Sequence, residues 1–61
     1  MRCIIVDDEP IARKGIQKLV ARISQLELLD SFNSAEAAAG YMQITNVDLI
    51  FLDIQMPGVN G

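Results

Sequence analysis

Three short apolar runs divide the chain, and each has the length and composition of a β-strand. The first (residues 3–6) and the third (residues 49–52) are uninterrupted, and an aspartate follows each of them. Runs of this kind are typical of strands that are buried on both faces of a parallel sheet. The second run, over residues 26–32, is broken by Glu27 and Asp30, so we expect a less buried strand at the edge of the sheet.

Between these runs, apolar residues recur every three or four positions, which predicts two helices. Pro10 suits the first position of the first helix, where its missing N–H costs nothing. The second helix is expected over residues 35–44, with Asn33 and Ser34 as N-cap candidates and Glu36 at capping-box spacing from Asn33. The apolar stripe of the first helix is expected to comprise Ile11, Gly15, Ile16, Leu19, Val20 and Ile23.

The alternation of strands and helices predicts an α/β fold, β-α-β-α-β, with a parallel sheet and right-handed crossovers. If the two uninterrupted strands are the inner ones, the strand order is 2-1-3. The two helices then lie on opposite faces of the sheet. The crevice between the carboxyl ends of strands one and three becomes a topological switch point, which is where open α/β sheets bind ligands.

Composition excludes several classes of function. The net charge is -3, so the chain offers no basic surface for nucleic acid. No apolar run approaches the ~20 residues that a membrane span needs, and the first residues do not resemble a signal peptide. With no histidine and one cysteine, Cys3, the usual zinc ligand sets are missing. We therefore expect a cytoplasmic protein without membrane contact.

The candidate chemistry lies where the uninterrupted strands end. Asp7 and Asp8 follow the first strand and Asp53 follows the third, so the predicted topology brings all three to one crevice. Clustered carboxylates repel one another, and a hard cation such as Mg²⁺ relieves that repulsion through oxygen ligands. A carboxylate can also form an aspartyl-phosphate, with a metal neutralising charge during the transfer. Each acid alone is equally compatible with a helix N-terminal charge or a turn residue; the combination is more specific.

Two stretches, residues 5–10 (IVDDEP) and 48–61 (DLIFLDIQMPGVNG), resemble the signature motifs of response-regulator receiver domains. Residues 53–57 (DIQMP) most resemble regulators with a LytTR-type DNA-binding effector. The resemblance covers the whole chain and implies a flavodoxin-like receiver fold. Because complete receivers are longer, residues 1–61 are expected to form a partial receiver domain.

The resemblance also implies a role for each matching residue. Asp53 is expected to be the phosphoacceptor and also a ligand of Mg²⁺. Asp8 is expected to bind Mg²⁺ directly with the help of Asp7, and Gln55 is expected to offer its backbone carbonyl to the same ion.

Partners follow from the same resemblance. The phosphoryl donor is expected to be a phosphohistidine on a sensor histidine kinase that docks near the first helix. Arg13, Lys14 and Lys18 then lie near the kinase or form an ordinary solvated face. DNA is expected to be contacted only through an output domain outside these residues. Strand three would be an exposed apolar edge, so we expect self-association through it.

Two other functions stay open. A haloacid-dehalogenase-like phosphatase also uses an aspartate nucleophile after a strand, but it needs a second aspartate two positions later, where this chain has Gln55. A receiver-like interaction module that is never phosphorylated is the other alternative. We expect a signalling module rather than an enzyme.

Overall fold

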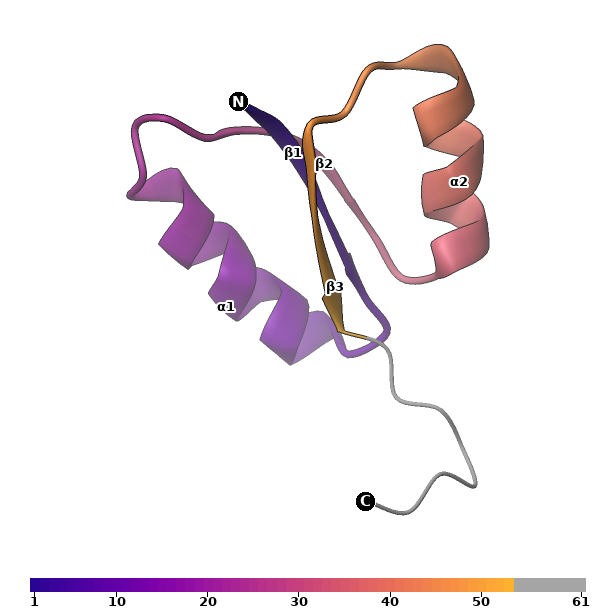
Figure 1. The fold of residues 1–61 in the computed structure, drawn as a ribbon. Coiled ribbons are helices and arrows are strands. Elements are labelled where there is room, and N and C mark those ends of the chain that lie inside the picture. The colour runs from indigo at the N-terminus through magenta and orange to yellow at the C-terminus, as the bar shows by residue number, and fades with distance from the viewer. Residues whose placement is uncertain (54–61) are drawn as a thin grey trace.

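Strands and helices alternate along residues 1–53, which are the part of the chain that this computed structural model describes (Figure 1). The order is that expected from the sequence. The elements are β1 (Arg2–Asp7), α1 (Pro10–Ala21), β2 (Glu27–Phe32), α2 (Ala35–Ile44) and β3 (Leu49–Asp53). Residues 54–61, which include the predicted metal ligand Gln55, lie outside the described residues.

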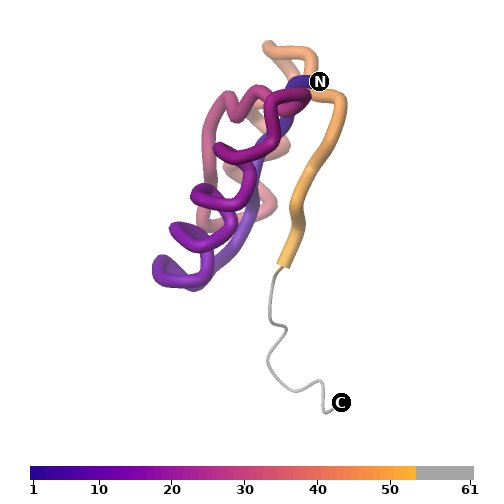
Figure 2. Tube along the Cα trace, turned by 90° about the vertical axis from the view of Figure 1, so that its left-hand side faces the viewer, coloured from indigo at the N-terminus to yellow at the C-terminus, as the bar shows by residue number. Residues whose placement is uncertain are grey.

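The three strands form one parallel sheet in the order β2-β1-β3, which confirms the predicted topology. The helices lie on opposite faces of this sheet, α1 on one side and α2 on the other (Figure 1). Both helices pack against β1 and β2. Figure 2 shows β3 standing apart from both helices, although Leu49 and Phe51 of this strand pack on the apolar cluster of the α1 face.

The central strand β1 supplies most of the core. Its residues alternate between two apolar clusters, one on each face of the sheet. Cys3 and Ile5 face α1 and pack with Val20, whereas Ile4 and Val6 face α2 and pack with Ala38. Burial raises the pKa of the Cys3 thiol above its ordinary value, and Cys3 packs in the core as a small apolar residue.

β2 has an irregularity in register just before Asp30, one of its two charged residues. Cys3 pairs with Leu28 but Ile4 pairs with Asp30, so one residue of β2 is skipped between them. Leu28 then packs in the cluster on the α1 face and Leu29 in the cluster on the α2 face, while Asp30 is exposed. The strand is less buried than β1, as predicted.

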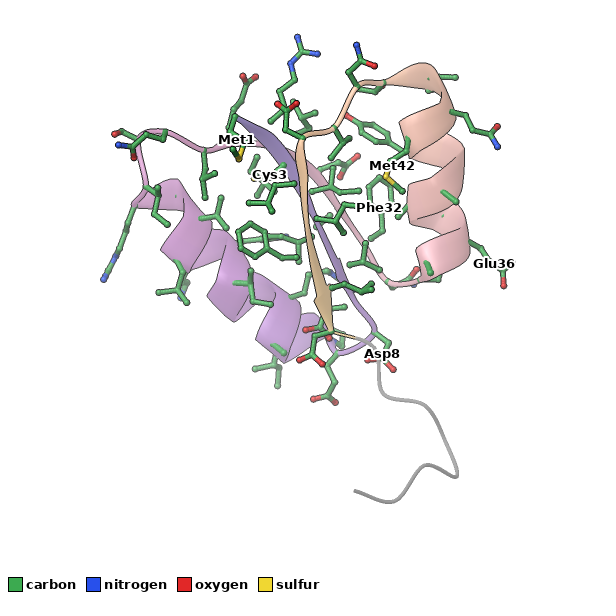
Figure 3. All side chains as sticks on the ribbon, viewed as in Figure 1. Met1, Cys3, Asp8, Phe32, Glu36 and Met42 are labelled. Carbon is green, nitrogen blue, oxygen red and sulfur yellow. The ribbon has the colours of Figure 1, made fainter. Side chains whose placement is uncertain are left out.

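α2 has the predicted bounds, and of the two N-cap candidates the structure uses Ser34 rather than Asn33. Ser34 is the N-cap, and its Oγ accepts a hydrogen bond from the N–H of Ala37 at 3.2 Å. The predicted capping box from Asn33 is therefore wrong, because a helix that begins at Ala35 places Glu36 in its second position rather than its third. Glu36 points away from the sheet (Figure 3).

The predicted apolar stripe of α1 is only partly buried. Ile16 and Val20 pack on the sheet, whereas Ile11 and Leu19 are 84% and 61% exposed. Gln17, the residue after Ile16, also faces the sheet and donates a hydrogen bond from Nε2 to Oγ of Ser31 in β2 at 2.8 Å. α1 is thus seated over β1 and β2, and the row of Ile11 and Leu19 has no strand beneath it in the described residues. None of the helices in residues 1–53 has the length and apolarity to cross a membrane.

A buried isoleucine of β1 and an exposed isoleucine of α1 give a matched test of stability. Ile5→Val should lower the free energy of unfolding by about 1 kcal/mol, because it removes a methylene from a fully buried site. The same change at exposed Ile11 should alter it by less than about 0.5 kcal/mol. Urea denaturation followed by circular dichroism measures both. An equal loss in the two variants would contradict the assigned seating of α1.

Candidate functional site

The predicted acidic residues gather at the carboxyl-end edge of the sheet. Asp7 is the last residue of β1, Asp53 is the last residue of β3, and the two are paired in register on adjacent strands. Asp8 follows in the turn before α1, and Figure 3 labels it at this edge, near the end of β3. The strand order thus brings residues far apart in the sequence to one edge.

Asp7 is buried and held by the turn that it begins. Its side chain is 2% exposed. Oδ1 accepts a hydrogen bond from the N–H of Glu9 at 2.9 Å, which is the Asx-turn geometry that aspartate favours. Oδ2 is also buried and finds no hydrogen-bond partner among the described residues. A buried carboxylate with one unsatisfied oxygen is costly and calls for a ligand.

Asp8 and Asp53 differ from Asp7 because both are exposed. The strand β3 ends at Asp53 on the side of the sheet that neither helix covers, so the carboxylate can be approached from solvent. Accessibility is what a group that reacts with another molecule needs. The edge therefore combines one fixed, buried acid with two acids open to a ligand.

Arg13 is a site residue that the sequence interpretation missed. It was expected on the solvated side of α1, near a kinase or simply in water. It is instead half-buried, and its Nη1 donates a hydrogen bond to the backbone carbonyl oxygen of Asp7 at 2.8 Å. Helical periodicity gives a partial signal, since Arg13 precedes the buried Val20 by seven residues, about two turns, and so lies on the same face of α1.

Comparison with known proteins decides the family. The family profile of the response regulator receiver domain matches residues 3–61. The chain belongs to this family.

Curated relatives of the receiver carry names from gene regulation. This chain is 34% identical over 61 residues to the transcriptional regulatory protein BtsR of Escherichia coli K12. The alignment covers 100% of this chain and 26% of that protein. The chain is 37% identical over 62 residues to the positive alginate biosynthesis regulatory protein of Pseudomonas aeruginosa, covering 100% and 25%.

The receiver thus spans about a quarter of the length of the curated relatives it matches. No solved structure gives a significant match to it. The family assignment favours the signalling interpretation over the haloacid-dehalogenase-like phosphatase.

The chemistry of the receiver's donors fits a hard cation. The predicted ligands are oxygens throughout, and Oδ2 of Asp7 is a buried carboxylate oxygen without a partner among the described residues. Within residues 1–53, no three His, Cys, Asp or Glu side chains are grouped closely enough to hold a metal ion. The predicted carbonyl ligand, Gln55, lies outside that range. The ligand assignments of Asp7, Asp8, Asp53 and Gln55 therefore stay predictions.

The unsatisfied oxygen of Asp7 predicts a stabilising substitution. Asp7→Asn keeps an Oδ1 acceptor for the N–H of Glu9 but removes a buried charge beside Asp53. In metal-free buffer it should raise the free energy of unfolding by about 1 kcal/mol. Asp30→Asn, at an exposed position of β2, should change it by less than about 0.5 kcal/mol. Urea titrations in EDTA would refute this account if Asp7→Asn proved less stable than the parent chain.

Proposed function

We propose that this receiver accepts a phosphoryl group on Asp53 from a phosphohistidine of a sensor histidine kinase. The observation that carries the proposal is the pairing of Asp53 with Asp7. It puts an exposed carboxylate beside a buried one, at the carboxyl-end edge of a sheet in a chain that belongs to the receiver family. In α/β folds of this type, that edge is where ligands bind.

In the proposed transfer, a carboxylate oxygen of Asp53 attacks the phosphorus atom. The phosphorus–nitrogen bond breaks, and its electron pair returns to the imidazole nitrogen of the donor. Exposure of Asp53 lets the donor approach along that line. Asp7 is held by the N–H of Glu9 and leaves one carboxylate oxygen without a hydrogen-bond partner at the site.

Mg²⁺ is the proposed cofactor. The carboxylates of Asp8 and Asp53 and the backbone carbonyl of Gln55 would hold it, and Asp7 would assist. When bound, the ion supplies positive charge against the oxygens of the transferring phosphoryl group. The acids of this chain supply the oxygen ligands that such an ion prefers.

The proposed output is control of transcription. It rests on the relatives, of which the protein from E. coli K12 is named as a transcriptional regulatory protein and is covered by this chain over 26% of its length. A LytTR-type DNA-binding output domain, a cytoplasmic location and a role as a signalling module rather than an enzyme belong to the same proposal.

Intact mass tests the acceptor. Incubation with Mg²⁺ and acetyl phosphate should add one phosphoryl group, about 80 Da, to the chain. Asp53→Asn should abolish this gain because it removes the nucleophilic carboxylate. Asp48→Asn, at the opposite end of β3, should leave it intact.

The other candidate functions give different outcomes in the same assay. No mass gain in the parent chain would favour an interaction module that is never phosphorylated. Steady release of inorganic phosphate, many turnovers per chain, would favour a phosphatase.

Self-association through β3 is a second proposal about partners. Within residues 1–53, β3 pairs with β1 on one side and with no strand on the other. Ile50 and Leu52 of this strand are 39% and 64% exposed. Figure 2 shows β3 standing apart from both helices. An apolar edge strand of this kind favours pairing with a second copy.

Sedimentation velocity measures this association. The chain should sediment as a species larger than a monomer at high concentration. Leu52→Lys should shift it towards the monomer, since a charge on the edge opposes pairing. Ile44→Lys, at an exposed apolar position of α2, should leave the distribution unchanged. A parent chain that stays monomeric would exclude the proposal.

A further inference from the structure

Arg13 is bonded to both sides of the turn that carries the acidic pair. Its backbone N–H donates to the carbonyl oxygen of Glu9 at 2.9 Å, which is the first hydrogen bond of α1. Its guanidinium Nη1 donates to the carbonyl oxygen of Asp7 at 2.8 Å. A helix needs the first bond but not the second, so the side chain makes a contact specific to this turn.

The bond to Asp7 restrains the peptide that joins the two acids. The carbonyl of Asp7 belongs to the peptide unit between Asp7 and Asp8, and that unit is planar. Holding its oxygen limits rotation of the whole plane, and therefore the direction in which the chain enters Asp8. The N–H of Glu9 closes the turn from the other side by donating to Oδ1 of Asp7. Asp8, although exposed, thus sits between two restrained neighbours.

The guanidinium is well suited to this task. A guanidinium is a charged donor, and a charged donor makes a stronger hydrogen bond to a carbonyl than a neutral one does. It is half-buried, so water competes poorly for the contact. Lys14, the next residue, is exposed and takes part in no bond of this turn.

We propose that Arg13 is a positioning residue of the cation site, which orients Asp8 by holding the carbonyl of Asp7. The inference rests on the proposed function, since it assumes that Asp8 binds Mg²⁺. It assigns Arg13 to the interior of the receiver rather than to the surface that meets a kinase. Partners that orient metal ligands typically change metal affinity by 10- to 100-fold when they are removed.

The direction in which Mg²⁺ affinity changes when Arg13 is removed distinguishes a positioning role from a purely electrostatic one. A positive group near a dication opposes its binding, so removing Arg13 would strengthen Mg²⁺ binding if the residue acted only through its charge. Removing a residue that orients a ligand weakens binding instead. The two explanations therefore predict opposite changes in the same dissociation constant.

Calorimetric titration with Mg²⁺ tests the proposal on the whole chain. Arg13→Met should raise the Kd for Mg²⁺ about tenfold. Arg13→Lys keeps a charged donor and should stay within about threefold of the parent. Lys14→Met removes a neighbouring charge without touching the turn, and it should leave the Kd unchanged or slightly lower. Circular dichroism checks that each variant is folded at the temperature of the titration.

Each outcome has a separate meaning. No binding by the parent chain overturns the proposed cation site and the role of Arg13 with it. Binding by the parent together with an unchanged or lower Kd in Arg13→Met overturns only the positioning role. If Arg13→Met does not fold, Arg13→Gln takes its place, because its shorter neutral side chain cannot reach the Asp7 carbonyl. A Kd equal to that of Arg13→Lys would then overturn the role, and a higher one would support it.

Discussion

Burial of β1 on both faces is the constraint on which the rest of the structure depends. A strand with apolar side chains on each side must be covered on each side, so α1 and α2 have to lie on opposite faces of the sheet. The chain meets this requirement by crossing over β1 between its two other strands. That crossing leaves β3 beside β1 and brings Asp53 next to Asp7. The acidic edge is thus a by-product of the way the core is closed.

The last residue of β1, Asp7, is also buried, although it is a carboxylate. Asp7 lies, with Cys3 and Ile5, on the face of the sheet that packs against α1. Unlike them it is a carboxylate, and burying a charged group in an apolar layer costs free energy. The N–H of Glu9 offsets part of that cost, and the remainder persists at Oδ2. A buried, partly unsatisfied carboxylate lowers the stability of a small domain, and a ligand bound at that carboxylate would stabilise the folded state. At this residue, the proposed function and the stability of the domain are opposed.

The sequence predicted the order of the elements because that order depends on gross features. Uninterrupted apolar runs, a proline at a helix start and aspartates after two strands are insensitive to small shifts in packing. The details that failed are sensitive to them. Periodicity placed Ile11 on an apolar stripe, but burial also needs a strand beneath it, and α1 is seated over β1 and β2. Arg13 was assigned to solvent because the pattern of charges cannot indicate which long side chain will fold back onto a carbonyl.

The skipped residue in β2 gives the sheet two unequal borders. Beyond the irregularity, Asp30 is exposed on this outer strand, and its Oδ1 accepts the N–H of Ser31 from its own chain. A distorted border that carries a charge resists the addition of a further strand, whereas within residues 1–53 the border at β3 keeps a regular register and carries its one charge, Asp53, at its end. Among the described residues, addition of a strand is therefore easier at β3 than at β2. Two copies that met at β3 would leave only their β2 borders outside, so the assembly would close as a pair rather than extend into a fibre.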